Sequence, residues 1–197
     1  MTHDPAPDWL AATLAADAAE GQGALPLAIR PLAPAYRIAG RVTAVTIATD
    51  DNLDLRQAMP RGPQPGPILL VAGGAASTCA CMGGLIAREM RLLGFTALIT
   101  DAPVRDAAEV RASGLLVWSR GLTAVAPGKR GGGHAGEARF GDVIARDGDF
   151  IIADEDGVIV WPWARYDELL ARARTRLESD KRRARELDAR EAESKRR

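Results

Sequence analysis

The sequence predicts a mixed α/β domain in which helices and strands form layers. Two apolar runs, 67–72 (PILLVA) and 95–100 (FTALIT), are typical of strands buried on both faces. A helix-length segment separates them, so the three elements are expected to form a right-handed parallel crossover. Near the other end of the chain, short β-branched runs alternate with the turn sequences DGD and DEDG, which indicates antiparallel hairpins. Together these patterns predict an α/β layered fold with a mixed sheet.

The composition is that of a folded globular protein. Of 197 residues, 47% are hydrophobic and 26% are charged, which is enough to build a core without disulfides. Cys79 and Cys81 are too few for a disulfide framework and too close for a common zinc site. Lysine plus arginine equals aspartate plus glutamate at 26 each, so we expect no nucleic-acid partner. Because the first residues do not form a signal peptide and no apolar run could cross a membrane, we expect a cytoplasmic protein without a membrane partner.

The first third of the chain is expected to contain a helix, a strand and a second helix. Asp8 can cap a helix that ends near Gly21. The β-branched residues of 40–49 indicate a strand, and 51–59 predicts a short helix that stops at Pro60.

The remaining elements follow the first buried strand. A glycine pair opens a turn after it, and a helix of about a dozen residues then reaches Leu93, with Gly94 as its cap. Further strands are expected at 115–119, 139–145, 150–153 and 157–161.

The chain is divided into a body, 1–164, and a charged C-terminal helix, 165–197. The second segment has no glycine or proline and contains 12 Lys/Arg against 8 Asp/Glu. Four apolar residues, Tyr166, Leu170, Ala173 and Leu177, recur at helical spacing, so the first turns are expected to pack against another surface. That surface is either the same chain or a neighbouring subunit, and the rest of the helix is expected to be solvated.

A small-residue segment after the first buried strand is a candidate anion site. It runs GGAASTCACMGGLIAR and opens a helix at Gly83 and Gly84. Backbone N–H groups at a helix N-terminus bind carboxylates or phosphates, and glycine leaves them accessible.

A charged segment follows the second buried strand, where α/β sheets bind their ligands. Arg105 and Asp106 are adjacent, and Glu109 lies three residues beyond Asp106, on the same face of a helical turn. A guanidinium suits a carboxylate ligand, and two acids with water suit Mg²⁺ or Mn²⁺. A surface ion pair among these three residues is the alternative.

The other motifs in the sequence are weaker indications of function. The segment GKRGGGHAG, from Gly128, lacks the flanking strand and helix of a dinucleotide site, although Lys129 and Arg130 can reach an anionic ligand. No P-loop or nucleophile-elbow sequence is present. Cys79 and Cys81 are interpreted as small buried residues rather than activated thiols.

Gly84, twenty intervening residues, Arg105-Asp106, two more residues and Glu109 resemble the G-x20-R-D-x2-[ED] motif of the RraA-like family. That family includes the regulator of ribonuclease E activity A and the class II 4-hydroxy-4-methyl-2-oxoglutarate aldolases. Further blocks agree in order, including ITDAPVRD at 99–106 and GDFIIADEDGVIVWP at 148–162. The similarity spans 8–163. Aldolases of the family often carry an acid where Gly84 stands, and here Glu109 supplies the acid in its place.

The resemblance implies a swivelling α/β/α domain that assembles as a homotrimeric or hexameric ring with active sites between subunits. It implies that backbone N–H groups of four residues hold the substrate carboxylate: Gly83, Gly84, Leu85 and Ile86. Arg105 would bind the 2-oxo acid and stabilise enolate charge. Asp106 would anchor the Mg²⁺ or Mn²⁺ cofactor, and Glu109 would hold one of its waters.

The implied activity is that of a divalent-metal lyase acting on a small 2-oxo acid. Retro-aldol cleavage of a substrate such as 4-hydroxy-4-methyl-2-oxoglutarate, or decarboxylation of oxaloacetate, leaves pyruvate enolate to be protonated. The alternative is a non-catalytic regulator that binds a protein partner such as a ribonuclease.

Overall fold

The structure is a computed structural model of the chain, and it describes residues 6–196. Its main element is a mixed sheet in which β1, β5, β4, β3, β2, β9 and β10 are neighbours in that order, while β6 pairs with β2. These strands are Arg30–Pro31 (β1), Ile38–Thr46 (β2), Ile68–Ala72 (β3), Ala97–Thr100 (β4), Leu116–Ser119 (β5), His134–Ala135 (β6), Phe150–Ala153 (β9) and Val158–Trp161 (β10). From β2 to β5 the strands are parallel, which confirms the predicted crossover pairing of β3 with β4.

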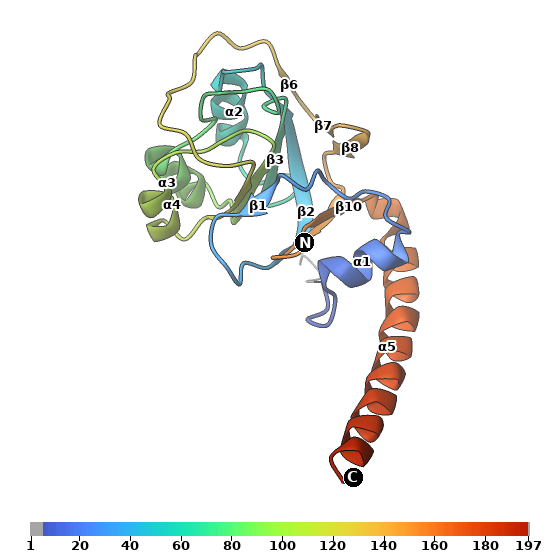
Figure 1. Cartoon of the computed structure of the whole chain (residues 1–197). Helices are drawn as coiled ribbons and strands as arrows, with labels where there is room; N and C mark the ends of the chain where they lie inside the picture. The colour runs from blue at the N-terminus through green and yellow to red at the C-terminus, as the bar shows by residue number, and fades with distance from the viewer. Residues whose placement is uncertain (1–5, 197) are drawn as a thin grey trace.

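Five α-helices accompany the sheet within the described residues. They are Ala12–Ala18 (α1), Leu53–Ala58 (α2), Gly84–Leu92 (α3), Ala107–Ala112 (α4) and Tyr166–Ser194 (α5). Short 3₁₀ segments at Met59–Arg61 and Trp163–Arg165 extend α2 and precede α5. Figure 1 shows α2, α3 and α4 together on one side of the sheet, and α1 with α5 at its other end.

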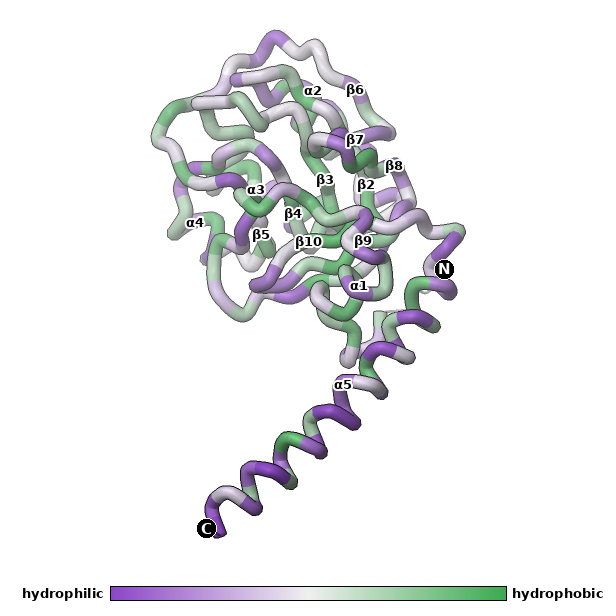
Figure 2. The backbone as a smooth tube through the Cα atoms, turned by 45° about the vertical axis from the view of Figure 1, so that its right-hand side comes forward, coloured by the Kyte–Doolittle hydropathy of each residue, from purple (hydrophilic) through white to green (hydrophobic). Residues whose placement is uncertain are grey.

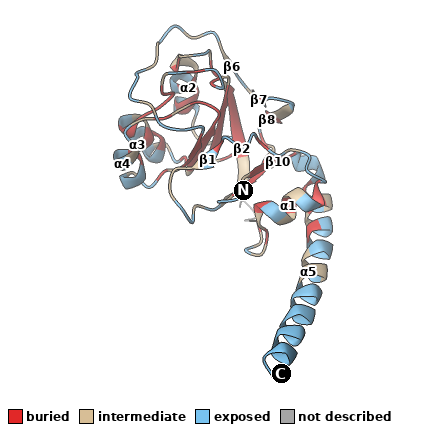
Figure 3. Ribbon diagram, viewed as in Figure 1, coloured by how far each residue is buried: buried red, intermediate tan, exposed pale blue. Residues whose placement is uncertain are grey.

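Side chains along the parallel strands point alternately to the two faces of the sheet, and each face is covered by its own hydrophobic core. Leu69 and Val71 of β3 face α2, α3 and α4, whereas Ile68 and Leu70 face the opposite core, which includes the β7–β8 hairpin. All five β3 residues are buried, as the apolar run predicts. The central strands are accordingly buried in Figure 3 and hydrophobic in Figure 2.

The region predicted as one strand at 139–145 is a hairpin, so that prediction is wrong. β7 (Glu137–Phe140) and β8 (Val143–Arg146) pair antiparallel, with Phe140 opposite Val143. Gly141 at the turn has φ +62°, a left-handed conformation that glycine adopts without steric cost. The predicted strand therefore reverses at its glycine.

The first helix is capped by a residue that is far away in the sequence. Asp8 does not cap it: α1 begins at Ala12, and its N-cap residue Ala11 has no side-chain cap. Instead, the Ala12 N–H donates to the Asp154 carboxylate at 2.8 Å, from the turn between β9 and β10. The cap prediction fails because the acceptor lies 142 residues away in the sequence.

The first turns of α5 pack against α1 of the same chain. Tyr166, Leu169 and Ala173 are buried there, so Leu169, rather than the predicted Leu170, is the fully buried leucine. The Arg176 guanidinium lies 3.0 Å from the Asp17 carboxylate. Beyond residue 180 the helix is exposed and extends away from the rest of the chain (Figures 1 and 3).

Within residues 6–196, no helix combines the length and hydropathy that crossing a membrane requires.

Candidate active site

The candidate site forms where two loops leave parallel strands at the same edge of the sheet. Since β3 and β4 are parallel, the chain leaves both strands in the same direction, toward α3 and α4 respectively. Two backbone hydrogen bonds join the loops. The Arg105 N–H donates to the Met82 carbonyl (3.0 Å), and the Cys81 N–H donates to the Pro103 carbonyl (2.9 Å). This pairing places the start of α3 beside the charged segment before α4.

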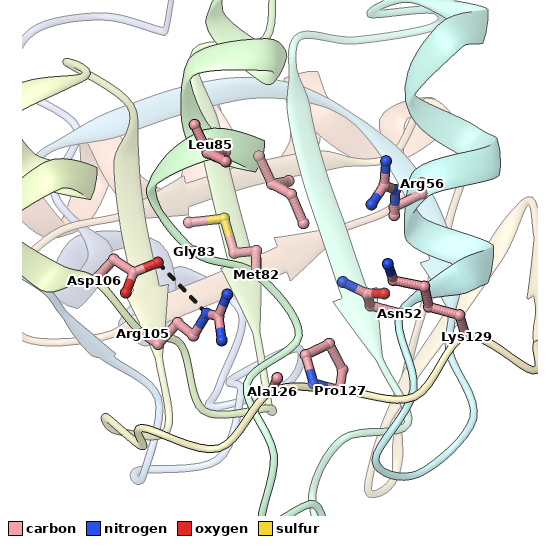
Figure 4. Close-up of a pocket in the computed structure, with 11 residues that line it drawn as sticks. Asn52, Arg56, Met82, Gly83, Leu85, Arg105, Asp106, Ala126, Pro127 and Lys129 are labelled. Atoms are coloured by element: carbon pink, nitrogen blue, oxygen red, sulfur yellow. Dashed lines mark ion pairs between the residues drawn. The ribbon is translucent and has the colours of Figure 1, made fainter.

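Asp106 links the two segments. One of its carboxylate oxygens lies 3.4 Å from Arg105 Nε and accepts a hydrogen bond from the Gly84 N–H at 3.2 Å. Asp106 has φ +55° and does not cap α4 with its side chain, so the carboxylate is directed toward α3 instead. Aspartate tolerates this left-handed conformation better than most residues. The Arg105 and Asp106 side chains are about 40% exposed, which leaves both accessible to a ligand (Figure 4).

Side chains of the charged segment approach Gly83 and Gly84 so closely that neither position has room for a Cβ atom. A Cβ atom on Gly83 would collide with the Asp106 carboxylate and lie 3.0 Å from Arg105 Cγ. A Cβ atom on Gly84 would collide with the Glu109 carboxylate and lie 2.6 Å from Glu109 Cβ. Thus the two predicted carboxylates flank the same glycine pair. An acid at position 84 would occupy the space that Glu109 uses, so the site holds one acid or the other.

The N-terminus of α3 retains donors for a ligand. Its first hydrogen bond joins the Ala87 N–H to the Gly83 carbonyl at 3.0 Å, so the N–H groups of Leu85 and Ile86 have no helical acceptor. The Gly84 N–H, by contrast, donates to Asp106. A carboxylate at this end of α3 would therefore be bound mainly by two amides together with the nearby Arg105 guanidinium.

A pocket of about 300 Å³ lies over these groups. It is lined by Asn52, Arg56, Met82, Gly83, Leu85, Ile86, Arg105, Asp106, Ala126, Pro127 and Lys129. Five of the seven predicted site residues thus line one cavity. Gly84 and Glu109 lie beside it: the Gly84 N–H donates to Asp106, and the Glu109 carboxylate lies next to Gly84.

Two pocket residues on the segment that begins α2 were missed by the sequence analysis. Asn52 and Arg56 are four residues apart, a spacing that places them on one helical face and could have indicated their association. Asn52 Nδ2 donates to the Cys81 carbonyl at 2.9 Å, which joins α2 to the loop before α3. Asn52 Oδ1 is the one buried side-chain nitrogen or oxygen atom of residues 6–196 without a hydrogen-bond partner.

Two buried groups beside the pocket have structural roles. Burial raises the pKa of Asp101, although its carboxylate accepts hydrogen bonds from the Gly74 and Gly73 N–H groups and so holds the loop after β3. Burial also raises the pKa of Cys81 to about 12, so its thiol is not activated. Cys79 is only half-buried, contrary to the prediction that both cysteines are buried.

Asp51 anchors the glycine-rich segment that carries Lys129. Its carboxylate accepts hydrogen bonds from the backbone N–H groups of Arg130 (2.6 Å) and Gly131 (3.1 Å). Burial alone would raise the pKa of Asp51, but these bonds and one from the Leu53 N–H outweigh it and lower the pKa. The ionised carboxylate is therefore the form that the folded protein stabilises.

We expect Asp51→Asn to lower the free energy of unfolding by about 1–3 kcal/mol at pH 7, because it removes the charged acceptor of three partly buried hydrogen bonds. The folded-state pKa lies below the unfolded value of about 3.9, so this contribution is complete above that value and is lost as pH falls through the folded-state pKa. Urea unfolding of both proteins between pH 7 and pH 3 measures the difference. The exposed Asp142→Asn serves as the control, and an equal loss in that variant would contradict the anchoring role.

No group of three or more His, Cys, Asp or Glu side chains is placed to hold a metal ion within the described residues. The donors at the pocket are instead one half-exposed carboxylate, Asp106, and a second beside it, Glu109. This donor set fits an ion that keeps most of its waters, as Mg²⁺ does, and does not fit a cage of protein ligands.

A model of the RraA-like family, described as Aldolase/RraA, matches residues 12–160. A protein of Halalkalibacterium halodurans named "Putative 4-hydroxy-4-methyl-2-oxoglutarate aldolase" is 29% identical over 176 residues, which cover 89% of this chain and 83% of the relative. A protein of the same name from Halorhodospira halophila is 32% identical over 147 residues, covering 72% of this chain and 88% of the relative.

Solved structures agree with this match. The RNA-processing inhibitor RraA from Thermus thermophilis superposes with a TM-score of 0.68 at 27% identity, covering 78% of this chain and 93% of that chain. RraAS2 of Streptomyces coelicolor, described as an unusual member of the RNase ES inhibitor RraA protein family, superposes with a TM-score of 0.76 at 22% identity. It covers 89% of this chain and 93% of that chain, and at this identity the likeness concerns the fold alone.

Proposed function

The chain belongs to the RraA-like family, and from this premise we propose that it is a divalent-metal-dependent carbon–carbon lyase that releases pyruvate from a 2-oxo acid. The observation that carries the proposal is the convergence of Arg105, Asp106 and the N-terminus of α3 on one pocket. A pocket with a guanidinium, free amides and a half-exposed carboxylate combines the groups that bind a 2-oxo acid and stabilise its enolate. The relatives named as 4-hydroxy-4-methyl-2-oxoglutarate aldolases support the same reaction class.

The chain's own residues have separate tasks in this reaction. The N–H groups of Leu85 and Ile86 bind the substrate carboxylate, and Arg105 donates hydrogen bonds toward the 2-oxo oxygen. Asp106 would hold Mg²⁺ or Mn²⁺, with Glu109 binding one of the waters around the ion. When bound, the ion supplies positive charge that polarises the oxo group.

Cleavage then proceeds as a retro-aldol step. A water molecule takes the proton of the 4-hydroxyl, whose oxygen forms a carbonyl with C4 as the C3–C4 bond breaks. The electron pair of that bond passes to C3 and the C2 oxygen to give the enolate of pyruvate, and the C4 fragment leaves as a second pyruvate. The developing charge on the C2 oxygen lies beside the Arg105 guanidinium, which binds it more strongly than the neutral oxo group. A proton from water then adds at C3 and completes the reaction. In oxaloacetate the same enolate forms when CO₂ leaves.

Removal of the metal tests this proposal. We expect 4-hydroxy-4-methyl-2-oxoglutarate to yield pyruvate in the presence of Mg²⁺, and EDTA to abolish that yield until excess Mg²⁺ is restored. Pyruvate release is followed with a coupled dehydrogenase, and oxaloacetate is assayed in parallel to compare aldolase with decarboxylase activity. Undiminished turnover in EDTA would contradict the metal-dependent mechanism.

We also propose that the protein forms a homotrimer or hexamer with active sites between subunits. Leu85, at the pocket, is 76% exposed. Leu122 and Val125 are also exposed, and both lie on the segment that bonds to the two site loops. Coverage by a neighbouring subunit would remove this apolar surface from water.

A second candidate function is that of a non-catalytic regulator that binds a protein partner. The exposed, densely charged half of α5 favours it, because this segment projects from the rest of the chain (Figure 2). The Thermus structure is described as an RNA-processing inhibitor. A folded protein with neither turnover nor Mg²⁺ binding would favour this second function.

A further inference from the structure

The enolate of the proposed reaction becomes pyruvate when C3 gains a proton, and the pocket contains one side chain that is able to deliver it. Arg56 and Arg105 are arginines, which do not lose a proton in proteins. Asp106 is a carboxylate, which is ionised near pH 7 and therefore has no proton to give. The remaining ionisable side chain among the described residues that line the pocket is Lys129, whose ammonium carries three N–H donors.

The Lys129 side chain has no partner that would hold its charge in place. Within residues 6–196 it forms neither an ion pair nor a hydrogen bond. A carboxylate beside a lysine stabilises the charged form of the amine. Its absence suits a group that gives up one proton and takes up another during the reaction.

A buried acceptor lies beside this lysine. Asn52 Nδ2 donates to the Cys81 carbonyl at 2.9 Å, which fixes the orientation of the amide, and Oδ1 has no hydrogen-bond partner among the described residues. Figure 4 shows the Asn52 amide next to the end of Lys129, and the Asn52 N–H donates to the Gly128 carbonyl at 3.3 Å. Because a buried acceptor without a partner is costly, the unpaired ammonium on the flexible lysine stem is the donor that suits Oδ1.

The opposite walls of the pocket direct C3 of the substrate toward Lys129. In the proposed complex the Leu85 and Ile86 N–H groups bind the carboxylate, and Arg105 binds the C2 oxygen. Since C2 is planar with three substituents, the third one, C3, points away from both of these groups. Arg105 and Lys129 lie on opposite sides of the pocket in Figure 4, so this direction leads to the ammonium.

We propose that Lys129 is the catalytic acid that protonates C3 of the pyruvate enolate, and that Asn52 Oδ1 is the positioning group that holds its ammonium. An N–H bond of Lys129 breaks as the electron pair of the enolate forms the C3–H bond and the C2 carbonyl is restored. The neutral amine then takes a proton from water, which balances the proton that the 4-hydroxyl gave to water. The inference rests on the proposed function, since it takes the enolate to form beside Arg105.

Exchange of the methyl hydrogens of pyruvate with D₂O isolates this step, because it reverses and repeats the protonation without breaking a carbon–carbon bond. Proton NMR of pyruvate with the full chain and Mg²⁺ measures the rate. Lys129→Ala is expected to lower it by about 10²-fold. Lys129→Arg should lower it equally, since arginine keeps the charge but does not transfer a proton. Ethylamine added to Lys129→Ala should restore part of the exchange.

Two variants of Asn52 separate the positioning role from the bond to Cys81. Asn52→Leu and Asn52→Asp both lose the donor to the Cys81 carbonyl, but only Asn52→Asp keeps an oxygen beside Lys129. Exchange should therefore be about tenfold faster in Asn52→Asp than in Asn52→Leu. A purely structural role of Asn52 would slow both variants equally, and that result would overturn the positioning role.

Lys181→Ala is the matched control, because Lys181 is an exposed lysine on α5 that does not line the pocket. It should leave the exchange rate unchanged. Exchange at the wild-type rate in Lys129→Arg would overturn the proposal.

Cleavage of 4-hydroxy-4-methyl-2-oxoglutarate by the wild-type protein is a separate readout. Cleavage together with undiminished exchange in Lys129→Arg contradicts the role of Lys129 alone. Exchange that depends on Lys129 in a protein that does not cleave the substrate contradicts the lyase activity and leaves the role of Lys129 standing. A wild-type protein that neither cleaves nor exchanges contradicts both.

Discussion

Arg105→Ala is expected to lower kcat/KM for 4-hydroxy-4-methyl-2-oxoglutarate by about 10²–10³-fold, because it removes the donor that the proposed mechanism places beside the developing enolate charge. The loss should appear mainly in kcat, since the charge on the C2 oxygen forms in the transition state rather than in the bound substrate. Arg105→Lys should recover only part of the activity, because an ammonium lacks the planar pair of donors that a guanidinium presents.

The Arg105 side chain is 39% exposed and its ion pair with Asp106 is near the surface, so unfolding in urea should change by less than about 1 kcal/mol. Arg88→Ala is the control, because Arg88 is an exposed arginine on α3 that does not line the pocket. Retention of more than half of the wild-type kcat/KM in Arg105→Ala would contradict the assigned role.

Gly83→Ala is expected to lower kcat/KM by about 10²-fold, although it adds only one methyl group. That methyl would collide with the Asp106 carboxylate and lie 3.0 Å from Arg105 Cγ and 3.1 Å from Arg105 Nε. Both side chains must therefore move, and displacement of a group with the proposed catalytic role by about 1 Å is enough for such a loss. Gly83 has φ −143°, which alanine adopts readily, so backbone strain does not contribute.

The measurement compares turnover and Mg²⁺ affinity of Gly83→Ala with those of Gly157→Ala. A Cβ atom at Gly157 would meet no heavy atom within 4 Å, so this control adds the same group in open space. Wild-type kinetics in Gly83→Ala would show that the Arg105–Asp106 geometry is not critical for the reaction.

The sequence was most informative where a local pattern determines the structure. The apolar runs at 67–72 and 95–100 correctly predicted the buried parallel strands β3 and β4, because a strand covered on both faces is apolar at every position. The region 139–145 was predicted as one strand, although it belongs to the hairpin at 137–146, because only Gly141 marks the reversal of the chain.

In the candidate site, the residues on the two loops that follow neighbouring strands could be predicted from motif spacing and from the family resemblance. Parallel strands bring such loops together at one sheet edge, which is why Gly83, Arg105 and Asp106 could be selected before the fold was known. Asn52 and Arg56 could not be selected in this way, because they enter the pocket through contacts of α2 with the loop before α3.

By itself, the sequence determined the α/β class, the order of the central elements and the charged groups of one edge of the pocket. These depend on periodicity and on residues close together in the chain. Only the tertiary structure decided that Asp154 caps α1 and that Glu109 occupies the space beside Gly84. Only the tertiary structure placed Arg56 and Lys129 in the same pocket as Arg105. Each of these contacts joins separate elements, and their approach is set by how the side chains of both cores pack together rather than by any local preference of the chain.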